Sequence, residues 1–486
     1  MGREIGGMEM GRFCEITGNK KKQELLEAVY NVLDGRNGGE NLLQLYRPEY
    51  GGIFVEGSVW EGVWTYNHFI GMTGWLPFLE PKLRRYSRNS IELWFKEQRE
   101  DGLFPVFVSK EGKNGGYFVD EDTEGDEWID GQLMGLMTIC EHILFARDFE
   151  WGTNVLSKLR KAIEYILNRK FVDSLIEVRM NGVCFERCYG YTGYPSTSQI
   201  FCVRALKLMA EVEIFLNSGR NVNELLALAE SIRESLMNKL FLPEGYFISA
   251  IDDKGKLHGK DDYFESHPNV MAAPLEIVKK KEAQSITKKI KAVPELDSNV
   301  PICSNYPARP VDEIRWTAGI GQHMNGGAWL GLGGFDVWTH LIAGEYERAE
   351  QLISLMVDMQ CNHQLQDRVE YFGADKEAKS GTTGCDHPAK HAAGGFGIIL
   401  RGLLGIQVDA SGIKCKPLLF PDIKRLKTKI PVRIGEKSIL LNIVNNSDNL
   451  SQVTSSDGTE FAIVDGQAKI DYVKLSDNTV IDIILS

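Results

Sequence analysis

The sequence lacks any uninterrupted apolar run of roughly eighteen residues, which is the length a helix needs to cross a bilayer. Its nine Cys are scattered without a Cys-x-x-Cys pair, which predicts reduced thiols rather than a disulfide framework. It also lacks a basic excess, since 67 acidic residues outnumber 55 Lys and Arg and give a net charge of −12. Because nucleic acids and anionic membranes attract basic surfaces, we expect neither as a partner. No signal-like apolar segment lies near residue 1, so we expect a cytoplasmic protein.

Several motifs of catalysis are missing as well. The sequence contains no Gly-Lys-Ser/Thr phosphate loop, no Gly-x-Ser-x-Gly elbow and no His-Glu-x-x-His zinc motif. The glycine-rich segments 319–327 and 331–335 do not open a βαβ unit, so they do not predict a dinucleotide site. We therefore expect no organic cofactor.

Helical periodicity is what the chain has in abundance, from about residue 22 to about residue 405. Pro81, Pro195 and Pro268 stand where a first helical turn tolerates proline, and Gly219 and Gly344 stand where helices end. The predicted helices are 22–34, 59–76, 81–98, 127–147, 152–169, 195–216, 222–239, 268–278, 283–290, 326–343, 346–360 and 389–405. Twelve helices in six consecutive hairpins predict a mainly α fold, an (α/α)6 toroid.

The connections between these helices alternate in length. The long ones are rich in Gly, aromatic and acidic residues, and long loops in a compact domain usually carry function. All six would lie on one rim of the toroid, and they are 35–58, 99–126, 170–194, 241–267, 291–325 and 361–388.

The pattern changes after residue 406. Segments 438–446, 459–466 and 479–486 are short and β-branched, and Asn, Asp, Ser and Gly separate them. All nine Trp and all nine His precede this region. We predict an N-terminal extension over 1–20, a toroid over 21–406 and a small antiparallel, sandwich-like β domain of structural role over 407–486.

Four stretches in this order resemble the six-hairpin glycosidases. They are 59–105, which contains QREDGLFP; 126–144, which follows an acidic loop; 324–353, which opens on MNGGAW; and 369–406, which opens on VEYFGAD. The most similar groups are the glycogen-debranching amylo-1,6-glucosidases and the mannosylglycerate and glucosylglycerate hydrolases of the processing α-glucosidase family. The resemblance implies an (α/α)6 fold and an inverting hydrolase of an α-linked glucoside or related glycan.

Such a hydrolase needs one carboxylic acid to protonate the leaving oxygen and one carboxylate to activate water. Glu370 is the candidate base, because it matches the base-bearing loop of the family; a surface pair with Arg368 is the alternative. Glu186 is the candidate acid. It lies in a stretch where the family's usual Trp-Asp is missing, and it is the only carboxylate there. Neighbours such as Tyr189 would raise its pKa.

Asp126, Glu127 and Asp130 form a rival cluster of carboxylates for catalysis or sugar binding. Asp126 and Asp130 are spaced i, i+4 at a predicted helix start, so both could face the inside of the toroid. Acids at a helix N-terminus are also stabilised by the helix dipole with no catalytic role, so both interpretations stay open.

Aromatic side chains stack on sugar faces, and several are candidates for this role. Trp60, Trp64 and His68 are spaced i, i+4, i+8 and would share one helix face, although a core stripe explains the same pattern. Trp329 follows the same logic, and Asn325 is a candidate ligand for a sugar hydroxyl.

The segment CDHPAKH at 385–391 raises the question of a metal. His387 and His391 could offer nitrogen ligands together with Asp386, but Pro388 at a helix start explains the motif structurally. In the resemblance this segment lines the sugar site, so we predict that His387 and His391 bind sugar and that no metal is held.

Other functions stay open on the sequence alone. A glycoside phosphorylase of the same build would need a basic pocket for phosphate, for which Arg309 and Arg315 are available. A sugar epimerase would rely on histidine acid/base pairs, and the nine His, mostly unpaired in motifs, argue against it. A toroid that binds glycan without cleaving it is the non-enzymatic alternative. In each case a glycan or glycoside is the expected ligand.

Overall fold

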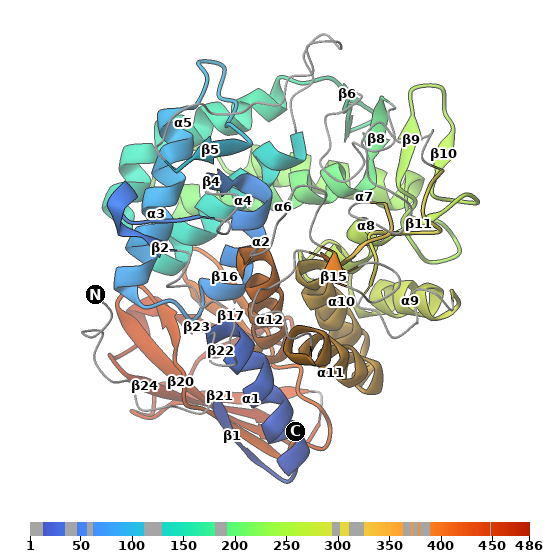
Figure 1. Cartoon of the computed structure of the whole chain (residues 1–486). Coiled ribbons are helices and arrows are strands. Elements are labelled where there is room, and N and C mark those ends of the chain that lie inside the picture. The colour runs from blue at the N-terminus through green and yellow to red at the C-terminus, as the bar shows by residue number, and fades with distance from the viewer. Residues whose placement is uncertain are drawn as a thin grey trace.

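The computed structural model describes residues 13–34, 46–55, 62–110, 129–179, 192–293, 302–310, 325–362, 371–372, 378–379, 389–447 and 449–486. Within these residues the chain forms twelve α-helices, as the periodicity predicted (Figure 1). They are α1 (Lys20–Asp34), α2 (Thr65–Trp75), α3 (Pro81–Lys96), α4 (Ile129–Ala146), α5 (Phe149–Leu167), α6 (Ser196–Phe215), α7 (Asn223–Lys239), α8 (Ser266–Met271), α9 (Lys280–Lys291), α10 (Leu330–Ala343), α11 (Tyr346–Asn362) and α12 (Ala389–Leu404). None of them is long and apolar enough to span a membrane.

The even-numbered helices form a closed inner ring. Each contacts the next, from α2 through α4, α6, α8, α10 and α12, and α12 returns to α2. Odd-numbered helices pack outside this ring, with α3 and α5 on α4, α7 on α6, α9 on α10, and α1 on both α11 and α12. This arrangement is the predicted (α/α)6 toroid.

The sequences of the two sets of helices explain their places. Every residue of α2 is buried, so this helix must be covered on all sides. In α3, by contrast, the buried positions include Ser87, Ser90, Ile91 and Trp94, which lie on one face three or four residues apart. A helix apolar all round belongs inside, and an amphipathic one belongs outside.

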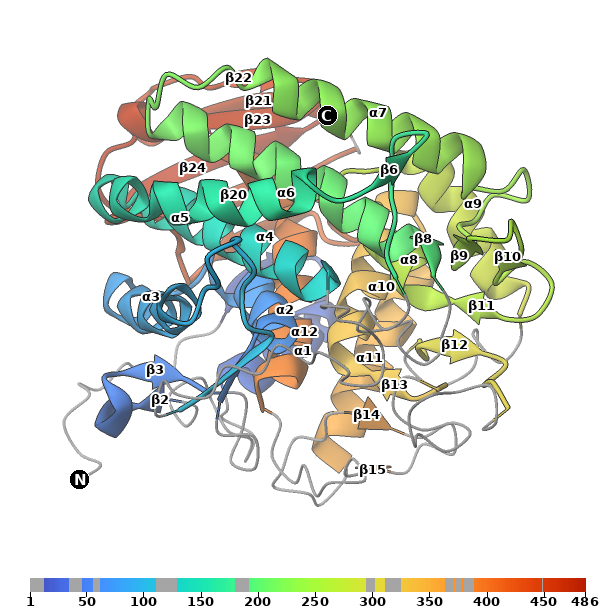
Figure 2. The ribbon, with the colours of Figure 1, turned by 90° about the horizontal axis from the view of Figure 1, so that it is seen from above.

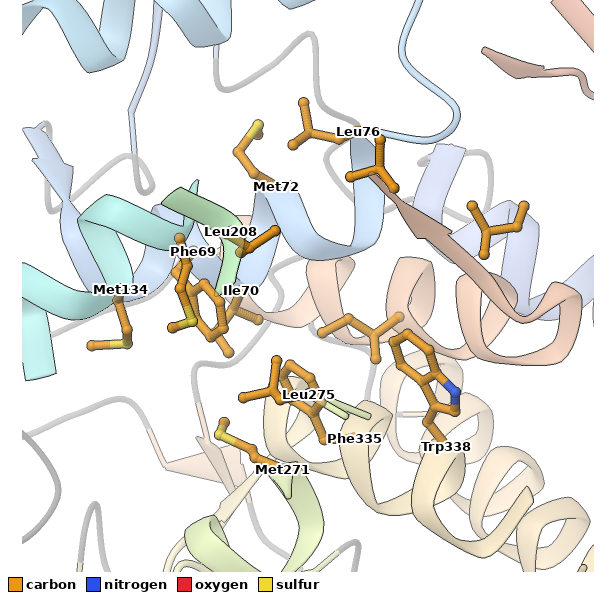
Figure 3. Close-up of a cluster of buried hydrophobic side chains, with 14 of the residues drawn as sticks. Phe69, Ile70, Met72, Leu76, Met134, Leu208, Met271, Leu275, Phe335 and Trp338 are labelled. Carbon is orange, nitrogen blue, oxygen red and sulfur yellow. The ribbon is translucent and has the colours of Figure 1, made fainter. Parts of the chain in front are cut away.

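Apolar side chains fill the axis of the ring. Phe69 of α2 lies 5.9 Å from Phe201 of α6 and 6.3 Å from Phe335 of α10, measured between ring centroids. Met134 and Met271 come from α4 and α8 into the same cluster (Figure 3). The middle of the toroid is therefore a packed core.

Glycines allow α12 to close the ring. A Cβ on Gly395 would lie 2.1 Å from the carbonyl oxygen of Leu330 in α10, and one on Gly394 would lie 2.8 Å from that of Ile70 in α2. The approach is mutual, because a Cβ on Gly74 would lie 2.3 Å from the carbonyl oxygen of Gly394. Backbone meets backbone on both sides of α12, which no larger residue permits.

We predict that Gly395→Ala lowers the free energy of unfolding by about 3 kcal/mol, because the obstructing atom belongs to the backbone and cannot rotate away. Gly135→Ala in α4 is the matched control. Its Cβ would meet Phe104 at 3.3 Å and its helix propensity would improve, so its effect should stay within about 1 kcal/mol. Urea unfolding of both variants measures the difference, and equal effects would contradict this explanation.

Two predicted helices differ in extent from the observed ones. The segment 268–278 holds only α8, which ends at Met271. Pro274 lacks a backbone N–H and its ring clashes with the carbonyl four residues earlier, so the helix cannot continue through it. The segment 59–76 begins its helix only at Thr65, because Gly62–Trp64 is strand β4. The predicted aromatic stripe is therefore wrong for Trp64, which is extended while His68 is helical; Trp60 lies outside the described residues.

The six long connections all precede an inner helix, so they lie at one end of the ring, which we call the rim. Short strands occupy it: β2 (Tyr46–Arg47), β3 (Ile53–Phe54), β4 (Gly62–Trp64), β5 (Phe107–Ser109), β6 (Phe171–Val172), β7 (Leu175–Ile176), β8 (Gly193–Pro195), β9 (Ala250–Asp252), β10 (Leu257–His258), β11 (Phe264–Glu265), β12 (Asn305–Tyr306), β13 (Ala328–Trp329), β14 (Tyr371–Phe372) and β15 (Ala378–Lys379). The short connections lie at the other end, the foot.

Two sheets lie at the foot, on the side opposite strands β12–β15 of the rim (Figure 2). One contains β1 (Cys14–Thr17), β18 (Arg425–Thr428), β19 (Val432–Ile434), β20 (Lys437–Asn445), β21 (Leu450–Ser455) and β24 (Thr479–Leu485); the other contains β16 (Ile406–Val408), β17 (Gly412–Cys415), β22 (Ala462–Val464) and β23 (Gln467–Asp471). The three segments predicted as strands overlap β20, β22 and β24.

These sheets add two features to the prediction. The pairings are antiparallel, as expected, except that β20 and β24 run parallel in the larger sheet. In addition, β1 pairs with β18, so residues from the predicted N-terminal extension complete the C-terminal sheet. The predicted boundaries at residues 21 and 407 stay a prediction.

A buried ion network joins the foot of the ring to the sheets. Arg401 of α12 donates two hydrogen bonds of 2.9 Å to Glu141 of α4. Arg204 of α6 lies 3.4 Å from Glu141 and 2.6 Å from Glu276, which in turn pairs with Lys414 of β17 at 3.0 Å. Arg401, Glu141 and Arg204 are buried, so removing one of these three would leave a buried partner uncompensated, whereas Glu276 and Lys414 are partly exposed.

The network predicts a dependence of stability on pH. Burial alone would raise the pKa of Glu276, but the positive charges of Arg204 and Lys414 outweigh it and lower the pKa to about 2. An unfolded Glu has a pKa of about 4.3, so this carboxylate stabilises the fold above that pH, and the contribution is lost as pH falls toward about 2. The Glu276→Gln variant should lose less stability than wild type between pH 5 and pH 2, as measured by thermal unfolding. The exposed Glu244→Gln should follow wild type.

Candidate functional site

Strand pairs join neighbouring loops around the rim. β4 pairs with β5, β8 with β9, β11 with β12, and β13 with β14, and each pair links the loop before one inner helix to the next loop in the chain. The pairs are two or three residues long and tie together the bases of the loops. The rim is therefore a fixed frame for loop residues from across the chain.

Four inner helices begin directly after a rim strand. The residue before each helix is extended and makes no side-chain capping bond: Trp64, Pro195, Glu265 and Trp329 for α2, α6, α8 and α10. The first N–H groups of α2, α6 and α8 donate to carbonyls of neighbouring rim segments, and the positive ends of the helix dipoles gather at the rim. Such a setting favours oxygen-rich and negatively charged groups there, from the chain or from a ligand.

Much of the predicted site lies outside the described residues. This applies to both proposed catalytic glutamates and to five of the proposed sugar-binding residues: Glu186, Glu370, Trp60, Asp126, Glu127, Tyr189 and His387. His391 belongs to the first turn of α12, but its side chain is also outside the described part.

The loops that carry the two glutamates nevertheless have described bases. Val178 and Gly193 exchange two backbone hydrogen bonds of 2.8 Å, which closes the base of the segment containing Glu186 just before α6. Tyr371, which follows Glu370 in the chain, pairs with Trp329 just before α10. Both loops therefore leave from the same rim.

Trp64 and His68 face different surroundings. Trp64 is partly exposed and its ring lies 4.7 Å from that of Phe107 on β5. His68 is fully buried; its ring meets Trp94 of α3 edge-on at 5.3 Å and its Nε2 lies 3.3 Å from the hydroxyl of Ser87. The geometry favours a packing role between α2 and α3 for His68, and it leaves Trp64 as the rim aromatic.

Asp130 lies fully buried in the first turn of α4, and its carboxylate accepts a 2.8 Å hydrogen bond from the backbone N–H of Gly131. This is the setting in which the positive end of a helix dipole stabilises an acid. The helix start predicted near this residue is confirmed, and its sugar-binding role stays a prediction.

Asn325 and Trp329 are both buried beside the rim. The side-chain oxygen of Asn325 accepts from the backbone N–H of Arg309 at 2.7 Å, and its amide nitrogen donates to the Arg309 carbonyl at 3.0 Å. Asn325 thus fixes the segment of Arg309, whose guanidinium lies 3.4 Å from Asp262 and over the ring of Tyr263. Trp329 ends β13, where it pairs with Tyr371.

A buried polar cluster at the rim was not predicted. Glu265, only 2% exposed, accepts a hydrogen bond from Ser249 and has Thr197 at 3.5 Å and Nδ1 of His267 at 3.7 Å. These residues come from the starts of α6 and α8 and from the turn before β9. The only sequence signal was three polar residues, Glu265 to His267, immediately before Pro268.

No group of three or more His, Cys, Asp or Glu suited to a metal occurs among the described residues. A histidine–carboxylate pair of the rim is His258 with Asp252 on the β9–β10 hairpin, where Nε2 and the carboxylate are 3.0 Å apart. Asp252 also accepts from the backbone N–H groups of Lys254 and Lys256. Local turn geometry accounts for this pair.

The double hydrogen bond of Asn325 generates a test of its structural role. Asn325→Ala should lower the free energy of unfolding by about 1–3 kcal/mol, because both backbone groups of Arg309 lose a buried partner. The exposed Asn446→Ala should change it by less than about 0.5 kcal/mol. Chemical denaturation measures both; no loss for Asn325→Ala would show that the clamp contributes nothing.

Comparison with known proteins places the fold. No known protein family and no curated protein matches the sequence. Solved structures do match: a GH78 family rhamnosidase of Bacillus sp. GL1, at a TM-score of 0.57 and 12% identity, over 89% of this chain and 42% of that one. A GH63 mannosylglycerate hydrolase from Thermus thermophilus in complex with glucose matches at a TM-score of 0.53 and 12% identity, over 76% of this chain and 99% of that one. A rhamnosidase from Klebsiella oxytoca with rhamnose bound matches at a TM-score of 0.55 and 12% identity, over 81% of this chain and 66% of that one.

The chain thus spans less than half the length of the first of these proteins and nearly all of the second. All three are glycoside hydrolases, and mannosylglycerate hydrolases were among the groups that the sequence resembles. The chain has the six-hairpin glycosidase fold, with an (α/α)6 ring and a β domain at its foot.

Proposed function

We propose that this protein is an inverting glycoside hydrolase that acts on an α-linked glucoside or a related glycan. The observation that carries the proposal is the convergence of the loops of Glu186 and Glu370 on one rim. The base of the first is closed by Val178 and Gly193 before α6, and that of the second is held by Tyr371 and Trp329 before α10.

In this proposal Glu186 protonates the leaving oxygen and Glu370 activates the water that attacks the anomeric carbon. An inverting pair stands roughly 6.5–9.5 Å apart to admit this water. The ring of Trp64 would stack on a sugar face, while Asp130 at the start of α4 would accept a hydrogen bond from a sugar hydroxyl. The proposed neighbours in the site are Trp60, Asp126, Glu127, Tyr189, Asn325, Trp329, His387 and His391.

Among these, Asn325 and Trp329 support the site from behind. Both amide atoms of Asn325 are engaged with the backbone of Arg309, so Asn325 would position this segment rather than bind sugar directly. Trp329 is 1% exposed and would fix the base of the Glu370 loop through β13. No metal or organic cofactor takes part in this proposal.

Activity is tested with a panel of α- and β-linked glucosides, mannosides and rhamnosides, with and without phosphate. Wild type should release sugar from at least one α-linked substrate in the absence of phosphate. Glu186→Gln and Glu370→Gln should each lower kcat by about 100-fold or more, as expected for loss of a general acid or base. Proton NMR of fresh product should show the inverted anomer.

Glu244→Gln is the matched control, because Glu244 is an exposed glutamate of another rim loop and should keep full activity. Full activity of both site variants would refute the assignment of the acid and base. Cleavage that requires phosphate would indicate a phosphorylase, and tight glycan binding without any cleavage would indicate a binding protein.

A further inference from the structure

A cavity of about 360 Å³ opens at the foot, far from the rim, and its wall is rich in arginine. It lies between the start of α3, the end of α4, the turn into α5 and the β-domain residues Gly435, Glu436 and Tyr472. Four cations and two carboxylates line it: Arg84, Arg85, Arg88 and Arg147, and Asp148 and Glu436. This excess of positive charge contrasts with the net charge of −12 of the whole chain. We call it the arginine pocket.

Arg84 is the most buried of these cations, with 3% of its surface exposed. Its terminal nitrogens donate only to backbone carbonyls, those of Phe145, Gly435, Leu76 and Arg433. Its Nε is buried without a hydrogen-bond partner in the described structure. Burial, and then the charge of Arg433, lower the pKa of Arg84 to about 9, and the charge of Glu436 opposes this shift only in part.

Two more nitrogens behind the wall also lack a hydrogen-bond partner within the described chain. Nε of Arg147 and Nδ1 of His142 are buried, and neither has a hydrogen-bond partner among the residues described. Arg147 directs its other nitrogens at the carbonyls of Asp409 and Ala410, and its guanidinium stacks on Phe215 and Tyr472. All three nitrogens are sealed from solvent, so they lie behind the cavity wall, and Arg84 and Arg147 would act on a ligand in the cavity through their charge.

Only one of the four arginines is neutralised by an ion pair with the described wall. Arg88 donates to Asp148 at 2.9 Å, and Asp148 also caps α5 by accepting from the backbone of Trp151. Arg85 is exposed at the mouth, as is Glu436. The wall therefore keeps a positive surplus, which favours an anion over a neutral ligand.

We propose that the arginine pocket binds a phosphate group, either as inorganic phosphate or as the phosphate of a small sugar ester. The four arginines come from α3 and from the α4–α5 turn, so their positive charges face the cavity from more than one element. A phosphate offers three or more acceptor oxygens in different directions, whereas a carboxylate offers two in one plane. The volume also accommodates the sugar of such an ester.

The ligand would act at the contact between the helix ring and the sheets at the foot. Arg84 bonds to the carbonyl of Phe145 in α4 and to that of Gly435 in the β domain, and Arg147 bonds to the segment before β17. An anion held by Arg84 and Arg147 would compensate the positive charges of these two residues, which connect the ring to the sheets. Binding to the folded state alone raises its stability by mass action.

The test measures binding to the full chain in two ways, by titration calorimetry and by thermal unfolding. NaCl keeps the ionic strength the same in all samples, so that a general salt effect is not mistaken for binding. Inorganic phosphate and glucose 6-phosphate are titrated in parallel. We expect a saturable rise in Tm for at least one of them. Tighter binding of glucose 6-phosphate would identify the ester as the ligand, and equal binding would identify phosphate itself.

Three variants locate the site. Arg85→Glu puts a negative charge at the exposed mouth without touching the core, and it should weaken binding by about tenfold or more. Glu436→Gln removes one of the two opposing carboxylates and should tighten binding by about threefold. Lys161→Glu makes the same change of charge on exposed α5 residue Lys161, which does not line the cavity, and it should leave the affinity unchanged.

The absence of any saturable effect would overturn the proposal. So would an effect that Arg85→Glu leaves unchanged, because the anion would then bind elsewhere, for example at the rim as the co-substrate of a phosphorylase. Since the measurement needs no glycoside, its outcome is independent of the proposed hydrolase activity.

Discussion

The ring depends on the close approach of α12 to both of its neighbours. As the last inner helix in the chain, α12 lies between α2 and α10 and contacts both. Gly394 and Gly395 let it do so, since a Cβ on either would meet a backbone carbonyl of the facing helix. Once this seam closes, the six inner helices bury Phe69 and Phe335 along one axis, and the direction of every inner helix is set.

From that closure follows the division of the molecule into two ends. Each inner helix starts at the rim, so the long loops gather there and the short turns gather at the foot. Polar side chains follow the same division. At the foot, Arg401 and Glu141 form ion pairs that fix α12 to α4. At the rim, Glu265 and Asn325 bind neighbouring backbone or side chains, which stiffens the frame below the loops.

Sequence alone predicted what periodicity encodes. It placed twelve helices, because burial on one face or on all faces leaves a repeat in the chain. It missed the short strand β4, since three residues carry no period, and so it set Trp64 on a helix. It extended α8 past Met271 although Pro274 forbids this. It could not foresee the parallel pairing of β20 with β24, because strand direction depends on contacts distant in the chain.

Site residues were harder to predict than the fold, for a physical reason. Whether His68 faces a ligand or the wall depends on which side of α2 meets α3, and a helix buried all round carries no polar face to reveal it. The same burial hid Glu265, whose neighbours Ser249 and Thr197 come from other segments.

Helix α4 connects the two ends, with Asp130 in its first turn and His142 near its last. Eighteen residues span about 27 Å, so a rigid helix could transmit a shift from the arginine pocket to the rim. Rigidity alone does not make the sites communicate, because coupling needs two states that each ligand favours differently. The glycine seam and the packed axis resist such a second state. The structure therefore favours an anion that stabilises the ring over one that switches the rim.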